Sequence, residues 1–443
     1  MFQRKIYQKL LEWKNGAYGD CSILIDGARR IGKSTIAEEF GKNEFDDYLL
    51  IDFRKANQNI KDSFGFLHDS MDKFFAALFL AAGRKAMDRG SLIIFDEIQF
   101  FPKAREWIKD FVADGRYKYI ETGSLISIKR NEAGIMIPSE EKRLYMYPMD
   151  FEEFLFAIGD EASSPMLKKA FESSDFSMIT QGIHRDLMQK YRLYLALGGM
   201  PKPLSKYIEN QDFLQAEQEK RTILDLYNDD LRSNDAKDKT RMNILYQNLA
   251  TQLGKAKSKR FIVGHIFGRS GRLLSDTLSN LESSRVVNLV YRSSSPEMGL
   301  SLFKAQTDFK AYSSDVGLLV SKVLTEIGDE TIYRKIIFAK DSTNLGMFYE
   351  NAVVQALVCN GYDPYYFTFA DKDSFYEIDC LIQRKGRICA IEVKSSSSFS
   401  TVSLDCFKKI YRSPKKDYYV LSPKMPYTEN GVVFLPLYFA FCF

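Results

Sequence analysis

The sequence predicts an α/β protein whose first domain is built on a parallel sheet. Four apolar segments of strand length, at 22–26, 48–53, 91–97 and 117–124, alternate with segments of helical periodicity. Strands that alternate with helices are joined by right-handed crossovers, and such a sheet binds its ligand at the carboxyl ends of its strands. The first and third segments also end in polar motifs, which indicate what this edge of the sheet binds.

The first strand leads into a glycine-rich turn that fits the pattern G-x-x-x-x-G-K-S. Glycines let the backbone approach an anion closely, and successive N–H groups of such a turn can point at phosphates. Lys33 is expected to reach the outer phosphates, and Ser34 to hold Mg²⁺. The helix that follows, at about 34–40, points its positive end at the same anion. The residues expected to bind ATP at this turn are Gly27, Ala28, Arg29, Arg30, Ile31, Gly32, Lys33, Ser34 and Thr35.

The strand at 91–97 ends in Asp96 and Glu97, as the partner motif of such a turn requires. Asp96 is expected to bind the Mg²⁺ shell, and Glu97 to orient and polarise the attacking water. Thr122 and Ser124 end the next strand at the same edge, where a polar side chain can sense the terminal phosphate. The alternative for the two motifs is an anion-binding turn and a strand that ends in solvated acids. The alternative for Thr122 and Ser124 is a plain turn at the end of a strand.

Composition excludes several other classes of protein. The chain has 443 residues, which predicts roughly two to four domains. Its net charge of +4, from 62 basic and 58 acidic residues, does not by itself predict a nucleic-acid partner. Six cysteines without a C-x-x-C pair and three distant histidines argue against disulfides, structural zinc and a Ser–His–Asp site. The longest apolar run, 74–82, is too short to cross a bilayer, and the N-terminus has no signal-peptide core, so we expect a cytoplasmic protein without membrane contact.

Helical periodicity prevails from 151 to 235, where we expect a helical lid over the nucleotide. A helical linker of purely structural role is the alternative. From 236 to 315, three helical segments and two alternating segments predict a winged helix, whose third helix enters the major groove of DNA. The basic run at 255–260, together with Arg269 and Arg272, would neutralise phosphates and makes DNA the expected partner. A charged loop that serves only protein contacts is the alternative here.

The last segment, 316–443, contains a helix followed by two strands that carry acidic residues. Glu350 lies on the helix, Asp379 on the first strand, and Glu392 and Lys394 on one face of the second. This set resembles the PD-(D/E)-x-K pattern of nucleases. The resemblance implies that Glu350, Asp379 and Glu392 hold Mg²⁺ and that Lys394 positions the water that the metal activates. A structural ion-pair cluster on a fold without cleavage is the alternative.

Five motifs together resemble the prokaryotic AAA-type ATPases that carry a winged helix and a nuclease-like C-terminal domain. They are G-A-R-R-I-G-K-S at 27–34, I-F-D-E-I-Q at 94–99, E-T-G-S at 121–124, Y-P-M-D-F-E-E-F at 147–154 and G-G-M-P at 198–201. The resemblance extends over most of the chain and implies ATP binding. The family usually shows a Gly-Arg pair ahead of the Tyr-Pro motif, where this chain has Glu141-Lys142-Arg143. Arg143 or Arg130 can supply a charge to a neighbouring subunit's nucleotide or be a solvated surface arginine, and the number of subunits stays open.

The sequence therefore predicts four parts: a P-loop ATPase core at 1–150, a helical lid at 151–235, a winged helix at 236–315 and a restriction-endonuclease-like α/β domain at 316–443. Two functions follow for an ATP-hydrolysing AAA-type ATPase that acts on or near DNA. In the first, ATP hydrolysis is coupled to Mg²⁺-dependent cleavage by the C-terminal domain. In the second, the chain is a nucleotide-gated switch that binds DNA or protein, and its nuclease-like domain is catalytically silent.

Overall fold

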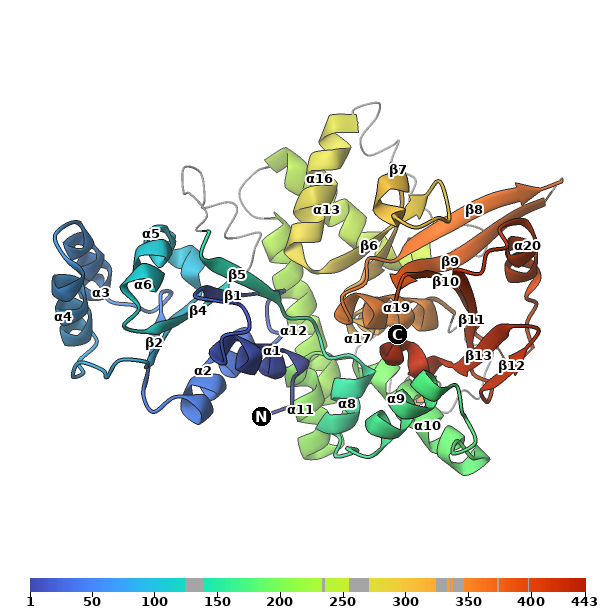
Figure 1. The fold of residues 1–443 in the computed structure, drawn as a ribbon, viewed down its shortest axis with the longest axis horizontal. Coiled ribbons are helices and arrows are strands. Elements are labelled where there is room, and N and C mark those ends of the chain that lie inside the picture. The colour runs from blue at the N-terminus through green and yellow to red at the C-terminus, as the bar shows by residue number, and fades with distance from the viewer. Residues whose placement is uncertain are drawn as a thin grey trace. The chain divides into compact units, whose positions relative to one another are not determined.

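The protein folds into two compact units, which consist of residues 3–147 and of residues 1–2 with 148–443. Each unit has its own sheet (Figure 1). The computed structural model describes residues 1–123, 139–232, 236–254, 271–323, 333–334, 336–337, 346–372, 374–396 and 398–443, except the side chains of 232, 236–240 and 271–273.

The sheet of the first unit has five strands within the described residues, in the order β2-β3-β4-β1-β5, and all pairings are parallel. This confirms the predicted parallel α/β sheet. The strands are β1 (Ser22–Asp26), β2 (Tyr48–Asp52), β3 (Leu92–Asp96), β4 (Lys118–Gly123) and β5 (Glu141–Tyr145). The helices are α1 (Lys5–Lys14), α2 (Lys33–Glu44), α3 (Gln58–Ser63), η1 (Phe64–His68), α4 (Met71–Ala81), η2 (Ile98–Phe100), α5 (Lys103–Glu106) and α6 (Ile108–Asp114).

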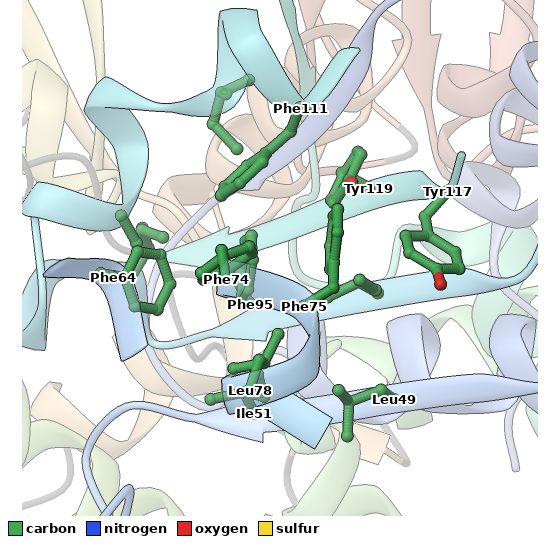
Figure 2. Packing of buried hydrophobic residues seen from close by; sticks show 14 of the residues in the cluster. Leu49, Ile51, Phe64, Phe74, Phe75, Leu78, Phe95, Phe111, Tyr117 and Tyr119 are labelled. Carbon is green, nitrogen blue, oxygen red and sulfur yellow. The ribbon is translucent and has the colours of Figure 1, made fainter. Parts of the chain in front are cut away.

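Aromatic side chains dominate the core of the first unit. Figure 2 shows Phe74, Phe95 and Phe111 packed together beside Tyr119 of β4. The rings of Phe74 and Phe111 stack with their centroids 5.1 Å apart, and Phe64 meets Phe74 edge-on at 5.0 Å. Such aromatic pairs each contribute about 0.5–1.5 kcal/mol beyond the burial of their area. Because Phe95 lies next to Asp96 on β3, this core fixes the strand end that carries the acidic motif.

The strand β5 is not predicted by the sequence. Its residues, Glu-Lys-Arg-Leu-Tyr, show no run of apolar side chains, and Leu144 is its one buried apolar residue. It pairs with β1 on one side, with Arg143 opposite Leu24. A strand with a partner on one side can keep charged side chains in contact with water, which is why hydrophobic periodicity does not reveal it.

The sheet of the second unit has eight strands in the described part of the chain, in the order β12-β13-β11-β10-β9-β8-β6-β7 (Figure 1). Strands β8, β9 and β10 form an antiparallel meander, and β11 is parallel to β10. The strands are β6 (Val287–Ser293), β7 (Lys304–Ser313), β8 (Tyr365–Asp371), β9 (Ser374–Arg384), β10 (Arg387–Val393), β11 (Lys416–Ser422), β12 (Tyr427–Glu429) and β13 (Val432–Pro436).

Helices make up most of the remaining described residues of the second unit, including most of the described part of the region predicted as a helical lid. They are α8 (Phe151–Ala157), α9 (Ser163–Ser173), α10 (Gln181–Leu197), α11 (Pro201–Asn210), α12 (Phe213–Arg232), α13 (Ala236–Gln247), α14 (Leu249–Leu253), α16 (Gly271–Ser284), η3 (Leu300–Phe303), α17 (Val316–Val323), α19 (Gly346–Cys359), α20 (Val402–Ile410) and η4 (Leu437–Cys442). The closing of a lid over a nucleotide stays a prediction.

The two alternating segments predicted for the winged helix form strands of the C-terminal sheet. Strands β6 and β7 pair in the antiparallel sense, and β6 also pairs in parallel with β8. The sheet therefore runs across the predicted boundary at 315/316. The basic run at 255–260 and Arg269 lie outside the described residues, as does the side chain of Arg272. The winged helix and the two domain boundaries beyond 150 stay predictions.

The Gly-Gly-Met-Pro turn holds the first residues of the second unit. It ends α10 with Gly198 at a φ of +79°, and Pro201 begins α11. The carbonyl of Gly199 accepts a hydrogen bond of 2.8 Å from the N–H of Met149, and the N–H of Gly199 donates to Asp315 Oδ2 at 2.6 Å. A Cβ atom on Gly199 would overlap the Met149 backbone. Only glycine therefore allows this close approach of two chain segments.

We expect Gly199→Ala to lower the free energy of unfolding of the second unit by about 1–3 kcal/mol, because an added methyl group forces two backbone segments apart. Urea denaturation measures this loss. Gly182→Ala on α10 is the matched control, since its added Cβ would meet Thr180 Oγ1 at an ordinary 3.8 Å. Equal stability of the two variants would show that the close contact at Gly199 is not needed.

Candidate functional site

The glycine-rich turn lies between β1 and α2, at the carboxyl edge of the parallel sheet. Arg30 and Gly32 adopt the left-handed region, with φ angles of +67° and +96°. A Cβ atom on Gly27 would overlap the carbonyl oxygen of Met146, so this position also requires glycine. The turn thus leads directly to the N-terminus of α2, where backbone N–H groups favour an anion.

Lys33, the first residue of α2, is folded back onto the turn. Its ammonium donates hydrogen bonds to the carbonyl oxygens of Gly27 and Ala28, at 2.9 and 2.8 Å. Burial lowers the pKa of Lys33, while the charges of nearby carboxylates, first of all Glu97, act in the opposite direction. A buried ammonium beside carboxylates can exchange its carbonyl partners for phosphate oxygens by rotating its side chain.

Arg4 is a residue of this site that sequence reasoning missed. Its buried guanidinium donates to the carbonyl oxygen of Ile31 in the turn at 2.8 Å, and to that of Tyr147 at 2.5 Å. One side chain therefore fixes both the glycine-rich turn and the last residue of the first unit. A single arginine close to the N-terminus carries no local motif, so only the structure identifies it.

The acidic motif at the end of β3 is fixed by Thr122 from the neighbouring β4. The hydroxyl of Thr122 donates to Asp96 Oδ1 at 2.5 Å and accepts a hydrogen bond of 3.1 Å from the N–H of Glu97. Glu97 adopts the left-handed region, with a φ of +55°, and its carboxylate accepts a hydrogen bond from the side-chain amide of Gln99. The structure thus brings Asp96, Glu97 and Thr122 together, as predicted, whereas Ser124 lies outside the described residues.

We expect Thr122→Val to lower the kcat of ATP hydrolysis by about 10- to 100-fold, because a hydrogen bond to a charged group contributes about 1.5–3 kcal/mol. Valine keeps the shape of the side chain but cannot orient the Asp96 carboxylate. Thr122→Ser is the control, since serine restores the hydroxyl. Steady-state ATPase assays compare the variants, and a fully active valine variant would remove Thr122 from this role.

A network of buried charges lies beside this site. Arg105 of α5 is almost fully buried and binds the carboxylate of Glu141 with two hydrogen bonds, at 2.6 and 2.8 Å. Glu121 of β4 accepts a hydrogen bond of 3.0 Å from Ser22, and burial followed by the charge of Glu141 raises its pKa well above the usual value. Arg143 is half-buried, 3.9 Å from Glu141. The sequence leaves two roles open for Arg143: a charge supplied to a neighbouring subunit's nucleotide, or a surface arginine. The structure adds a third, in which Arg143 takes part in this network of buried charges.

The C-terminal carboxylates of the predicted nuclease motif also come together in the second unit. Asp379 of β9 accepts a hydrogen bond of 2.9 Å from the N–H of Val393 on β10. Burial, followed by the charge of Glu350 on α19, raises the pKa of Asp379 to about 7. Glu392 lies on the adjacent strand β10 and is ion-paired with Lys394 at 2.6 Å. Local sequence patterns are therefore sufficient to find these four residues.

A buried lysine that sequence reasoning missed lies among these carboxylates. Lys310 of β7 is fully buried, and its ammonium is 2.6 Å from Glu377 Oε1 and 3.5 Å from Glu350 Oε1. Tyr312, two residues further on the same strand, donates a hydrogen bond of 2.5 Å to Glu350 Oε1. Both carboxylates thus have partners from β7.

Two carboxylates of the predicted metal site, Glu350 and Glu392, are ion-paired with Lys310 and Lys394. Within the described parts of the chain, no group of three or more His, Cys, Asp or Glu side chains is placed to hold a metal ion. That Glu350, Asp379 and Glu392 bind Mg²⁺ stays a prediction.

The first unit has the architecture of a P-loop nucleoside triphosphatase. Its strand β1 leads through the glycine-rich turn into α2, and β3, two strands away in the sheet, ends in the Asp-Glu pair. Residues 20–155 match a family model described as an AAA domain, so the chain carries an AAA-type P-loop ATPase domain. Residues 188–330 and 345–439 match the models of two domains of unknown function, DUF8612 and DUF4143.

A search of the solved structures found matches at low identity. A Walker-type ATPase from Pyrococcus abyssi is 17% identical, with 73% of this chain and 96% of that chain covered and a TM-score of 0.42. A signal transduction ATPase of the STAND class with a tetratricopeptide repeat sensor, from Pyrococcus horikoshii, is 11% identical, with 82% and 48% covered and a TM-score of 0.29. Cdc6p from Pyrobaculum aerophilum is 12% identical, with 76% and 93% covered and a TM-score of 0.25.

A search of the curated proteins found no match. Among the helices that the structure describes, none combines the length and the apolar character that crossing a lipid bilayer requires.

Proposed function

We propose that this chain binds Mg·ATP at the glycine-rich turn, hydrolyses it, and uses the cycle to change the state of its second unit. The observation that carries the proposal is the Lys33 ammonium, held by the carbonyl oxygens of the turn and faced by the charges of Asp96 and Glu97. A buried ammonium in this position is available to a triphosphate that displaces it from the turn.

Each residue of the site has a separate role in this proposal. Lys33 binds the outer phosphates, and Glu97 orients and polarises the attacking water. The Ser34 hydroxyl and the Asp96 carboxylate are hard oxygen donors that fit Mg²⁺, which takes few protein ligands when it is bound to phosphates. When bound, Mg²⁺ neutralises charge on the phosphate oxygens. Thr122 keeps Asp96 and the N–H of Glu97 in place.

The chain segment that links the two units supports the coupling of ATP to the second unit. On the side of the first unit, Arg4 joins the glycine-rich turn to the carbonyl of Tyr147. In the second unit, the carbonyl of the nearby Met149 accepts hydrogen bonds from Tyr194 at 3.1 Å and from Gln355 at 3.3 Å. Gln355 lies on α19, the helix that also carries Glu350. The backbone of residues 147–149 and its hydrogen bonds therefore connect the glycine-rich turn to α19, so a change at the turn can reach that helix.

DNA is the partner that we propose for the second unit. The support is the basic run at 255–260 with Arg269 and Arg272, whose charges would neutralise DNA phosphates. A protein partner that binds the same basic run is the second candidate.

A combined assay tests this proposal. ATP turnover and nucleic-acid binding are measured over a range of salt concentrations with double-stranded DNA, single-stranded DNA and RNA. We expect that neutralising the lysines and arginine of 255–260 makes the plot of log affinity against log salt less steep, because fewer counterions are released. An unchanged slope would contradict DNA contact by this run and leave the protein partner.

We propose that the C-terminal site does not cleave nucleic acid. The two ion pairs that engage its carboxylates, Lys310 with Glu377 and Lys394 with Glu392, support a silent site. The same assay tests this point. We expect no cleavage with or without ATP, and Asp379→Ala should change nothing catalytic. Mg²⁺-dependent cleavage that Asp379→Ala abolishes would establish the nuclease instead.

A further inference from the structure

The buried Lys310 is placed where two elements of the C-terminal cluster converge. Glu350 reaches it from α19 and Glu377 from β9, and Asp379 lies two residues beyond Glu377 on the same face of β9. The side chain of Lys310 is completely buried, while that of Glu377 is 36% exposed. The ammonium is thus enclosed by the protein and by carboxylates.

We propose that the Lys310 ammonium is a built-in cation that takes the place of a divalent metal ion among Glu350, Glu377 and Asp379. This rests on the proposed silent C-terminal site and gives the physical reason for it. The site is complete without a metal, because its cation is part of the chain.

The charges around Lys310 support a cation at this point. Carboxylates come from α19 (Glu350), β9 (Glu377 and Asp379) and β10 (Glu392), and ammoniums from Lys310 and Lys394. Burial would lower the pKa of Lys310, but the charges of Glu350, Glu377 and Asp379 outweigh it and raise the pKa. The ammonium therefore stays charged.

Geometry supports the assignment as well. An ammonium has three donors and can serve several carboxylates at once, as a metal ion would. Two of its neighbours, Glu377 and Glu350, belong to different elements, so the lysine joins α19 to β9 through β7. A divalent ion at the same point would have to displace Lys310 or lie beside it, and two cations at such a distance repel each other.

Removing the ammonium tests the proposal. Lys310→Met keeps the aliphatic stem but leaves the buried carboxylates without their cation. In the full-length, nucleotide-free chain we expect Mn²⁺ to leave the Tm of the wild type unchanged and to raise the Tm of Lys310→Met by several degrees. Electron paramagnetic resonance should then detect bound Mn²⁺ in the variant. Lys304→Met, at an exposed lysine on the same strand, is the matched control and should behave as the wild type.

A second substitution separates charge from packing. In the Lys310→Met background, Asp379→Asn removes one of the uncompensated charges, so it should restore stability and abolish the response to Mn²⁺. In the wild type, the same substitution removes a negative charge that attracts Lys310 and should not stabilise the protein. The effect of Asp379→Asn on stability should therefore differ between the two backgrounds. No such difference is expected if Lys310 only fills space.

Three results would overturn the inference. One is Mn²⁺ binding by the nucleotide-free wild type that Asp379→Asn abolishes, and it decides the matter even if Lys310→Met does not fold. Another is a folded Lys310→Met variant that shows no response to Mn²⁺. The third is the same effect of Asp379→Asn in both backgrounds. Cleavage of nucleic acid would contradict the proposal that the C-terminal site is silent, and this result is distinct from the three above.

Discussion

Replacing Glu97 with glutamine is expected to slow ATP hydrolysis by about 10²–10⁴-fold, the range typical of the loss of a general base. Glutamine has the same size and can still accept the hydrogen bond of Gln99, but it cannot polarise water as a carboxylate does. Nucleotide affinity should remain nearly unchanged, because Glu97 acts on the water and not on the phosphates. Single-turnover assays together with equilibrium binding of ATP separate these two effects.

Glu106→Gln is the control for this experiment. Glu106 is exposed on α5, close to Glu97 in sequence, and lies outside the nucleotide site, so its loss should leave hydrolysis unaffected. If Glu97→Gln hydrolysed ATP as fast as the wild type, the water-activating role would have to be assigned to another residue.

A large effect on nucleotide affinity is expected when Lys33 is replaced. Lys33→Met should weaken nucleotide binding by about 10- to 100-fold, since a hydrogen bond between charged groups contributes about 1.5–3 kcal/mol. The substitution also removes the two hydrogen bonds to the carbonyl oxygens of Gly27 and Ala28, so circular dichroism must confirm that the variant is folded. Isothermal titration calorimetry with an ATP analogue that is not hydrolysed measures the affinity.

Lys42→Met on the same helix is the matched control. Lys42 lies at the other end of α2, is half-exposed and forms a surface ion pair with Glu38. A surface pair of this kind contributes little to stability, and the residue is remote from the turn, so ATP affinity should not change. An equal loss of ATP affinity in Lys33→Met and Lys42→Met would mean that Lys33 acts only by stabilising the fold of α2.

The parts of the site that the sequence predicts are those with local motifs. The glycine-rich turn, Asp96 with Glu97, and Thr122 follow strands whose apolar residues reveal them, and a parallel sheet brings their ends to one edge. In the C-terminal half, the alternation of side chains along β9 and β10 is sufficient to place Asp379, Glu392 and Lys394.

Residues that act through distant contacts could not be predicted in this way. Arg4 is 27 and 143 residues from its two partners, and Lys310 is 40 and 67 residues from its own. No periodicity or motif identifies such pairs, because they exist only once the chain is folded. The C-terminal cluster shows this limit most clearly. The sequence predicts its acids but not Lys310, and acids considered without that cation indicate a metal site.

The strand β5 shows a related limit. Strand prediction relies on alternating or continuous apolar residues, whereas β5 consists mainly of charged residues and joins the sheet through backbone hydrogen bonds with β1. Its acidic residue Glu141 is nevertheless buried against Arg105. In β5, a buried ion pair therefore takes the place of the buried apolar side chains that stabilise the other strands. This pair can be seen only in the three-dimensional structure.

The most direct measurement is the binding of Mg·ATP to the purified wild-type chain by isothermal titration calorimetry, compared with Lys33→Met. The proposal predicts saturable binding at one site in the wild type and a much weaker affinity in the variant. A wild-type chain without affinity for adenine or guanine nucleotides would contradict it.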